Sequence, residues 1–580
     1  MNRTRTVAAL LGVTALVAVS VQLGASGAVA ALPASGQEAA AQAVSLPPLP
    51  AHTVGASIVD ANGHSFRLNC VNWFGEEQFN MIPDGLDQVP IATITSEIAS
   101  LGYNCVRLPW TNQTWEVNPV IGTQLASQVP DPEASSFTYN LSMSGLQANN
   151  PQFVGEHVDT IFEQVAQDLS DAGIMTILVN GQTNAADCCG ASDPDAGWYA
   201  PGYPSVSYAT QNAWVSDWKS VTVAFDSIPG VVGVDLRNEP RGSSVTWGPS
   251  GTYDWHAAAE LGGDAVQSVD PHMLIIVEGV NFATDLSAVG SLPVTLTDPG
   301  QVVYEFHDYG FDFSSITGYD DLMSKIGSQW GYLYGKVPLW LGEFGCDISP
   351  GAGETNCSDG KGNLGPWFGP LVRYLYYHNT AWAYWALNPG SYGVLTSSWD
   401  GVADSDLQNA LAAIQGRCPA NPIANGTYYI KNVATGQVID IPHSNTAQGT
   451  QLDQWPRNGG KNQQWTVDNL GCGLDEITSV LDGQSIDIRN AATSSGGAVQ
   501  EYGYGAGGNQ QFVVHDDGSG DGACTISAIN SMTDITNPFP IEVPGASTTD
   551  GTLLDQAAPT GAADQDWTFT DVSTGSTVTC

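Results

Sequence analysis

Two glutamates in the first two thirds of the chain are placed so that they could work as a pair of acids. Glu239 lies in the segment RNEP (237–240) and Glu343 in the segment GEFG (342–345), and each follows a short apolar run. Cleavage of a glycosidic bond needs two carboxyl groups: one protonates the departing oxygen, and the other attacks the anomeric carbon or directs water at it. Either glutamate alone could equally well form a salt bridge or cap a helix, but the pair favours this chemistry.

Short apolar runs that end in polar residues would have to position these two side chains. There are eight of them, at residues 67–75, 104–110, 174–181, 231–240, 274–280, 302–310, 337–345 and 380–388. Helical periodicity separates several of the runs; in 157–173 one face carries Val158, Ile161, Phe162, Val165 and Leu169. Apolar strands that alternate with helices are typical of parallel strands buried on both sides. We therefore expect an α/β fold, a (β/α)8 TIM barrel over residues 52–415, with its active site at the carboxyl ends of the strands. A doubly wound open sheet is the alternative, although no GxGxxG motif follows an early strand.

Five motifs in this region resemble those of family 5 glycoside hydrolases, the retaining β-glycanases of clan A. They are RLP (107–109), RNEP (237–240), HDY (307–309), GEFG (342–345) and YW (384–385). Each motif is moderately specific, but together they keep the family's order and fall at the ends of the apolar runs. The resemblance implies a cellulase-like hydrolase of O-glycosidic bonds that retains the anomeric configuration, with its two carboxyl groups about 5–5.5 Å apart.

The resemblance gives the two glutamates different roles. Glu239 would be the general acid/base, which must carry a proton when substrate binds, and a second carboxylate nearby would raise its pKa. Glu343 would be the nucleophile, kept ionised by positive charge and hydrogen bonds. Arg107 would supply that charge and Tyr309 a hydrogen bond.

Three more residues would support the acid or contact the sugar. By resemblance, Asn238 would bond the sugar 2-hydroxyl, and His307 would orient the region of the acid/base. Trp385 would offer an aromatic floor to the apolar face of a pyranose ring. It could instead pack in the core, because the run TAWAYWALN holds more aromatic side chains than a cleft can take.

The third run departs from the family pattern. The family places a histidine at the end of strand three, whereas this chain has Asn180, Gly181 and Gln182 there. The CCG that follows at 188–190 resembles the Cys-Cys segment of a lectin-linked branch of the family, so the alignment holds and the histidine is absent. Asn180 or Gln182 could donate a hydrogen bond in its place but neither can transfer a proton, and Asp187 lies too far along the chain to be a clear substitute. The departure motivates a second hypothesis, a carbohydrate-binding protein with an impaired catalytic barrel.

A threefold repeat follows a short linker, which we place at 416–424. GQVIDI (436–441) is followed by NQQW, GQSIDI (483–488) by NQQF and FPIEV (539–543) by DQDW, and each glutamine follows its acid by 23 residues. Three copies of short strands predict an all-β β-trefoil domain over 425–580, and the Q-x-W tripeptide resembles ricin B-type lectins. Trp465, Phe512 and Trp567 are expected to fill its core.

Two copies of the repeat are candidate sugar-binding sites. In that lectin family the ligand is held by the acid, by an aromatic residue that stacks on the sugar and by the polar residues of the tripeptide. The third copy has Glu542 but Ala557 in place of the aromatic residue, so we expect it to be silent. The acids could instead only cap turns of a structural trefoil. The candidate residues are Asp440, Trp455, Asn462 and Gln463 in the first copy and Asp487, Tyr502, Asn509 and Gln510 in the second.

Charge composition narrows the partners. The 580 residues include 16 Lys+Arg and 59 Asp+Glu, for a formal net charge of −43. A nucleic acid or an anionic membrane surface would require clustered basic residues, so a neutral polysaccharide is the better partner. The sequence shows no metal-ligand spacing and no nucleotide-binding loop, and we expect neither a metal nor a cofactor.

The N-terminal segment predicts export. Arg3 and Arg5 precede an apolar run that ends in the A-x-A pattern of residues 28–30, which is typical of a cleaved signal peptide (1–30) before a spacer (31–51). A membrane anchor is the alternative. Ten cysteines agree with an oxidising compartment and predict disulfides. We therefore expect a secreted, extracellular protein.

Together these patterns predict a secreted endo-β-glycanase of the cellulase type, an endo-β-1,4-glucanase, which a lectin module targets to polysaccharide. A β-mannanase, a β-1,3-glucanase and a β-1,6-galactanase remain open, because loop residues set the linkage that is cleaved.

Overall fold

The structure is a computed structural model that describes residues 45–122, 141–186, 188–190, 196–203, 206–250, 252–313, 315–349, 355–358, 364–416, 419–516, 522–531 and 539–580. The predicted signal peptide, most of the predicted spacer and Asp187 lie outside the described residues. Within the described ranges, no helix combines the length and the apolar character needed to cross a membrane.

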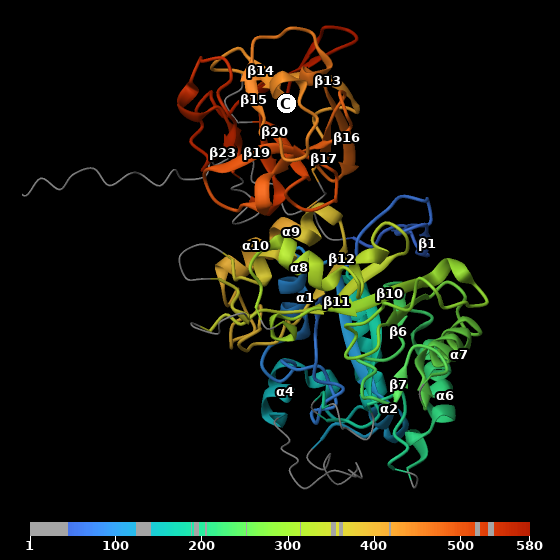
Figure 1. The fold of residues 1–580 in the computed structure, drawn as a ribbon. Coiled ribbons are helices and arrows are strands. Elements are labelled where there is room, and N and C mark those ends of the chain that lie inside the picture. The colour runs from blue at the N-terminus through green and yellow to red at the C-terminus, as the bar shows by residue number, and fades with distance from the viewer. Residues whose placement is uncertain are drawn as a thin grey trace, which may run out of the picture. The chain divides into compact units, whose positions relative to one another are not determined.

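Eight parallel strands close into a barrel, as the eight apolar runs predict (Figure 1). Each strand falls inside one run or extends one residue beyond it, and β12 pairs with β3 to close the ring. The expectation of a TIM barrel is therefore confirmed, and the open-sheet alternative is wrong. In order around the ring the strands are β3 (Asn69–Asn72), β4 (Cys105–Thr111), β5 (Met175–Gln182), β6 (Val231–Asp235), β9 (Leu274–Glu278), β10 (Val302–His307), β11 (Leu339–Phe344) and β12 (Ala381–Tyr384).

Helices surround these strands, with α1 on one side and α6 and α7 on the other in Figure 1. The periodic segment 157–173 forms α5 and buries the predicted face. Polar caps begin several helices: the side chain of Asp254 accepts a hydrogen bond from the Ala257 N–H at the start of α7. The helices are α1 (Ile91–Ser100), α2 (Asn112–Val117), α4 (Met143–Asn149), α5 (Val158–Asp171), α6 (Gln211–Phe225), α7 (Trp255–Gln267), α8 (Tyr319–Ile326), α9 (Phe368–His378) and α10 (Ser405–Gln415).

The barrel interior changes from apolar to charged toward the carboxyl ends of the strands. Successive side chains of a strand point to opposite faces, so residues two apart share the interior. On β9 the apolar Ile276 is followed two residues later by Glu278, and on β10 Val303 is followed by Glu305 and then His307, all of them buried. This places a layer of ionisable groups directly beneath the strand ends.

Strand β11 passes this layer at a glycine. A Cβ on Gly342 would overlap the Oε1 atom of Glu305. The first glycine of the GEFG motif is thus required by a buried carboxyl group on the neighbouring strand, and it lets Glu343 follow at the rim.

Disulfides form as the cysteine content predicts. Cys70 on β3 bonds Cys105 on β4, which cross-links two neighbouring barrel strands. None of the cysteines within the described ranges is free. The other described pairs are Cys188–Cys189, Cys346–Cys357 and Cys524–Cys580.

The C-terminal region is all-β and repeats one four-strand unit three times, as a β-trefoil requires. Trp465, Phe512 and Trp567 are fully buried in one apolar cluster, which confirms the predicted core. The strands are β13 (Gly426–Asn432), β14 (Val438–Asp440), β15 (Asp453–Trp455) and β16 (Trp465–Gly471); β17 (Leu474–Ser479), β18 (Ser485–Ile488), β19 (Gly497–Tyr502) and β20 (Phe512–Asp516); β21 (Cys524–Ala528), β22 (Ile541–Glu542), β23 (Asp555–Gln556) and β24 (Trp567–Asp571), followed by β25 (Thr577–Val578).

One buried position breaks the threefold symmetry of this core. Gln454 and Gln556 precede the aromatic position in the first and third copies, and their Nε2 groups donate to backbone carbonyls. The second copy has Glu501 there, fully buried, and within the described residues neither of its carboxyl oxygens has a hydrogen-bond partner. Burial raises the pKa of Glu501 to about 8.

We predict that Glu501→Gln stabilises the protein by about 1–3 kcal/mol at neutral pH, because a buried carboxylate without a partner is replaced by an amide. A glutamate in an unfolded chain has a pKa of about 4.3. Because the folded pKa lies higher, the destabilisation by Glu501 is absent below the unfolded pKa. It grows as the pH rises toward the folded pKa of about 8. Thermal melts should therefore show a larger gain at pH 8 than at pH 4. Asp468→Asn, at an exposed carboxylate on β16, is the control, and an equal gain at both pH values would contradict the prediction.

Candidate active site

The predicted pair of glutamates meets at the carboxyl ends of the barrel strands. Glu343 is on β11, and Glu239 follows β6. Both line a cavity of about 470 Å³. Its other lining residues are Cys188, Cys189, Asn238, Phe282, Tyr309, Phe311, Asp312, Trp385 and Tyr392.

Glu343 is held by the two residues that the sequence predicts. Its Oε1 accepts a hydrogen bond from Arg107 Nη1 at 2.7 Å, and its Oε2 accepts one from the Tyr309 hydroxyl at 2.9 Å. The carboxyl group is nearly buried, with 8% of the side chain exposed. These two hydrogen bonds fix the orientation of the carboxyl group.

Arg107 is the centre of the charged layer below the cavity. It is 1% exposed, and every contact it makes is to an acid or an amide oxygen. Burial disfavours its charge, but four carboxyl groups outweigh this and raise the pKa of Arg107 well above its usual range. The partners are Asp235 (2.7 Å), Glu343 (2.7 Å), Glu278 (2.8 Å), the Asn238 Oδ1 (2.8 Å), the Asn72 Oδ1 (3.1 Å) and, as an ion pair, Glu305 (3.4 Å).

Glu239 occupies a different environment. Its backbone lies in the left-handed region, with φ 48°, and its N–H donates to Glu278 Oε2 at 2.5 Å. Its Oε1 lies 3.0 Å from His307 Nδ1. Burial raises the pKa of Glu239, while Arg241 and Arg107 oppose the shift. From the sequence we expected a second carboxylate to raise the pKa of Glu239, whereas desolvation is the main cause.

His307 connects the acid/base candidate to the buried layer. Nδ1 faces Glu239, and Nε2 lies 3.3 Å from Glu305 Oε1. Burial lowers the pKa of His307 to about 4, so the imidazole is neutral near pH 7. Burial also raises the pKa of Glu305 well above its ordinary value.

The two carboxyl groups are close together. One oxygen of Glu239, one oxygen of Glu343 and a ring nitrogen of His307 lie within 4.8 Å of one another. This proximity agrees with the short separation that the resemblance implies.

Asn238 and Trp385 both reach the cavity. The Asn238 Oδ1 accepts a hydrogen bond from Arg107, and its amide N–H groups face Cys188 and Cys189, which line the cavity. Trp385 is half-buried and stacks on Phe74, with ring centroids 5.3 Å apart. The core alternative for Trp385 is thus only half right: one face packs inside while the residue lines the cavity.

The first two trefoil copies bring their predicted residues together. In the first, Asn462 Nδ2 donates to Asp440 at 2.7 Å, and Trp455 on the neighbouring strand is 40% exposed. In the second, Asn509 Nδ2 donates to Asp487 at 2.7 Å and Tyr502 is 44% exposed.

The tripeptide glutamines have a different place from the other predicted sugar ligands. Gln463 and Gln510 are buried and bond backbone groups of their own loops: Gln463 Oε1 accepts from the Asn458 N–H, and Gln510 Oε1 accepts from the Gly505 N–H. They therefore position the loop between the aromatic residue and the asparagine. In the third copy Gln565 donates to Glu542, beside Ala557.

Comparison with known proteins decides the family. A family model described as cellulase (glycosyl hydrolase family 5) matches residues 59–391, more than half of the chain. An endoglucanase of Paenibacillus polymyxa is 32% identical over 374 residues, which cover 60% of this chain and 83% of that protein. The chain belongs to glycosyl hydrolase family 5. It is a glycoside hydrolase that acts on O-glycosyl bonds.

Other relatives agree. The major extracellular endoglucanase of Xanthomonas campestris is 27% identical over 372 residues, 60% of this chain and 68% of that protein. A solved cellulase–inhibitor complex is 25% identical with a TM-score of 0.51, covering 63% of this chain and 98% of that one. An endocellulase from Pyrococcus horikoshii, 24% identical with a TM-score of 0.51 over 64% of this chain and 100% of that one, shares the fold. Residues 418–502 match a ricin-type β-trefoil lectin domain model.

In this family 5 hydrolase the end of the third barrel strand, β5, has a structural role. Asn180 is buried: its Oδ1 accepts from Arg237 at 2.9 Å, and its carbonyl accepts from the Asn238 N–H at 2.9 Å. Gln182 is buried as well and donates to the Ala186 carbonyl. Neither residue lines the cavity, so the hydrogen bond expected from Asn180 or Gln182 in place of the histidine is not available to a substrate there.

Sequence reasoning missed three buried acids, Asp235, Glu278 and Glu305. Each contacts Arg107, and Glu278 also fixes the backbone of Glu239. The alternation of side chains along a strand could have revealed them, because each lies on the interior face of an otherwise apolar strand. An unpaired acid is costly there, so a buried acid implies a charged partner.

We predict that Arg107→Lys leaves a folded protein but lowers kcat on a soluble oligosaccharide by roughly 10²-fold, because one ammonium cannot reproduce the guanidinium's planar set of donors and Glu343 shifts. Steady-state kinetics with thermal melts measure it. Arg457→Lys, at an exposed trefoil arginine, is the matched control and should keep wild-type kinetics. Unchanged kcat in Arg107→Lys would show that Glu343 does not depend on this bridge.

Proposed function

We propose that the protein is a secreted retaining endo-β-glycanase of the cellulase type, with Glu239 as acid/base and Glu343 as nucleophile. The observation that carries the proposal is the contrast between two carboxyl groups within 4.8 Å of one another. Glu343 accepts hydrogen bonds from Arg107 and Tyr309, whereas Glu239 faces a neutral imidazole and has a pKa raised by burial. One group is prepared to attack and the other to hold a proton.

The reaction follows from these positions. Glu343 attacks the anomeric carbon while the glycosidic C–O bond breaks, and the proton of Glu239 goes to the departing oxygen. The resulting ester joins the sugar to Glu343. Glu239, now a carboxylate, takes a proton from water as the water oxygen attacks the same carbon, which releases Glu343. Two inversions at one carbon give net retention.

Asn238 and Trp385 would hold the sugar for both steps. The Asn238 amide lies beside the two acids and can donate to the 2-hydroxyl, a hydrogen bond that strengthens as charge develops at the anomeric carbon. Trp385 would stack against the apolar face of a pyranose ring. Two relatives are endoglucanases, which supports a glucan substrate, and one of them is a major extracellular enzyme, which supports secretion.

We predict that the wild type releases reducing ends from carboxymethylcellulose and gives a β-anomer as its first product, read by proton NMR. Glu343→Ala should lose turnover on every substrate. Glu239→Ala should lose about 10²–10⁴-fold on oligosaccharides but keep the first step on an aryl glycoside, whose leaving group needs no acid. Activity should fall as the pH rises through the pKa of Glu239, because the acid must be protonated.

The same assay is run on mannan, β-1,3-glucan and β-1,6-galactan, so that cleavage of another linkage would be detected. Glu97→Gln, at a half-exposed carboxylate on α1, is the matched control. Release from none of the four by the wild type between pH 4 and pH 8 would favour the impaired carbohydrate-binding protein, to which the missing strand-three histidine points. An α-anomer would exclude retention.

We also propose that the trefoil binds carbohydrate and targets the barrel to polysaccharide. Trp455 and Tyr502 are exposed, and each lies beside a carboxyl group that an asparagine orients. At each site the polar groups could accept and donate hydrogen bonds to sugar hydroxyls while the ring stacks on the sugar. Two weak sites on one polymer reinforce each other through avidity.

We predict that Trp455→Ala with Tyr502→Ala lowers retention on insoluble glycan about tenfold or more and leaves hydrolysis of short soluble substrates unchanged, because only stacking is lost. Leu470→Ala, at an equally exposed apolar side chain of β16, is the matched control. Pull-down on the insoluble form of the preferred substrate measures retention. Equal retention of the double variant and the wild type would leave the trefoil a structural domain.

A further inference from the structure

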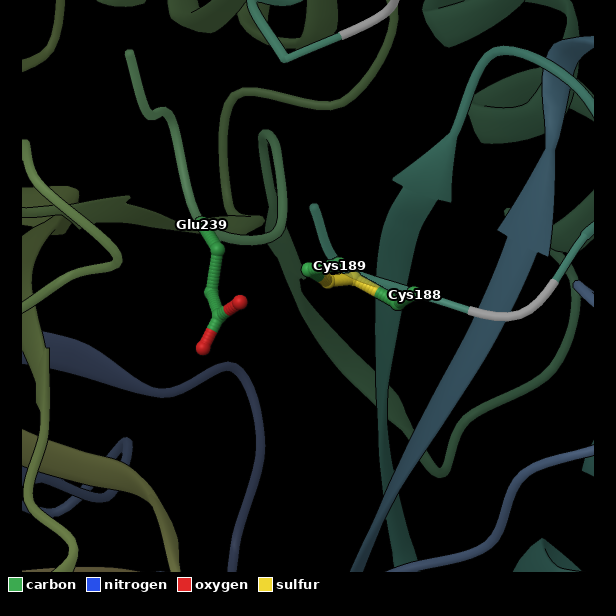
Figure 2. Close-up of side chains that lie close together, drawn as sticks. All are labelled: Cys188, Cys189 and Glu239. Carbon is green, nitrogen blue, oxygen red and sulfur yellow. A yellow bond between two sulfur atoms is a disulfide. The ribbon is translucent and has the colours of Figure 1, made fainter. Parts of the chain in front are cut away.

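The cavity has a wall that the family mechanism does not use, the disulfide between the adjacent residues Cys188 and Cys189. Cys188 is exposed and Cys189 is half-buried, and both line the cavity. Figure 2 shows the disulfide next to the carboxyl group of Glu239. The two Sγ atoms and one Glu239 oxygen lie within 4.8 Å of one another.

The disulfide also contacts Asn238, the residue beside the acid. Asn238 Nδ2 lies 3.5 Å from Cys188 Sγ and 3.7 Å from Cys189 Sγ, whereas its Oδ1 is taken by Arg107. Sulfur is a weak acceptor, so these contacts turn the amide toward the cavity without using up its donors. A sugar hydroxyl can therefore replace them at little cost.

A buried arginine fixes the segment that carries the disulfide. Arg241 is 1% exposed; its Nε donates to the Gly190 carbonyl at 3.0 Å and its Nη1 to the Glu239 carbonyl at 3.1 Å. One guanidinium thus holds the residue after the disulfide and the acid in a common frame. The wall and Glu239 are positioned together.

A metal site is a poor interpretation of this trio. A cysteine binds a metal ion through its thiolate, and both sulfurs are already in a covalent bond. What the disulfide offers instead is an apolar, polarisable surface with no strong hydrogen-bonding group.

We propose that the Cys188–Cys189 disulfide is a sugar-contacting wall of the active site, which packs against the apolar face of the pyranose that Asn238 and Glu239 engage and keeps water from the acid. The inference rests on the proposed function and goes beyond it by making substrate affinity depend on the redox state of this pair. Burial of Glu239, which raises its pKa, is consistent with such a wall.

Reduction would remove the wall. A dithiol such as dithiothreitol supplies two electrons and two protons, its own sulfurs join in a ring, and Cys188 and Cys189 become two thiols. Cys188 is an exposed residue, whereas both members of the Cys70–Cys105 and Cys346–Cys357 pairs are buried. Mild reduction should therefore act first at the cavity.

The experiment compares the wild type, Cys188→Ala/Cys189→Ala and the control Cys524→Ala/Cys580→Ala, which removes a trefoil disulfide. With cellotetraose or mannotetraose, the cavity variant should show a KM raised about tenfold, a change comparable to losing one apolar contact, with a smaller change in kcat. Its basic limb in kcat/KM should move to lower pH because Glu239 gains water. Dithiothreitol should shift the wild type and the control variant in the same direction and leave the cavity variant unchanged.

Several outcomes overturn the inference. A cavity variant with wild-type KM and pH profile would show that the disulfide does not contact the sugar. A dithiothreitol effect of equal size in the cavity variant would assign the sensitivity to another disulfide. If the cavity variant does not fold, as near-ultraviolet circular dichroism would reveal, reduction of the wild type still decides: an unchanged KM, with the loss of this disulfide confirmed by mass spectrometry, excludes the wall. If the wild type hydrolyses neither oligosaccharide, the proposed cellulase-type function itself fails. If the wild type hydrolyses one of them, the comparison tests the disulfide alone.

Discussion

One buried guanidinium organises the active end of this barrel. Arg107 on β4 contacts Asn72 on the neighbouring strand β3. Across the ring it is the shared partner of Asp235 on β6, Glu278 on β9 and Glu343 on β11. Removing a partner from such a cluster leaves uncompensated charge in a medium that solvates it poorly, so each member constrains the others. The carboxyl group that we assign to attack is therefore placed by the whole ring of strands.

The same layer makes two glutamates unlike each other. Glu343 lies on the cationic side, in direct contact with Arg107. Glu239 lies beyond it, and His307 stands between Glu239 and the buried Glu305. Because a neutral imidazole brings no positive charge, it leaves the proton affinity of Glu239 high. A division of labour between two residues of one type thus arises from their neighbours alone.

Most of the fold and much of the candidate site could be predicted from the sequence. Apolar runs located all eight barrel strands, the motifs located both glutamates, and the repeat offset located the three buried aromatic residues of the trefoil. Asp235, Glu278 and Glu305 escaped because a residue inside an apolar run is normally interpreted as core. Gln463 and Gln510 are buried supports of their loops, and no spacing in the sequence distinguishes a residue that touches a ligand from one that holds the residue that does.

The strand-three departure and the adjacent cysteines are connected through one short stretch of backbone. The Asn180 carbonyl accepts from the Asn238 N–H, and the Asn180 side chain anchors Arg237, so the end of strand three is used to fix the segment that carries Asn238 and Glu239. The cavity beside that segment is then bounded by Cys188 and Cys189. A histidine at position 180 could also donate and accept one hydrogen bond, but its ring would place them differently from the amide that bonds Arg237. The end of the third barrel strand thus takes part in positioning the segment that carries the acid.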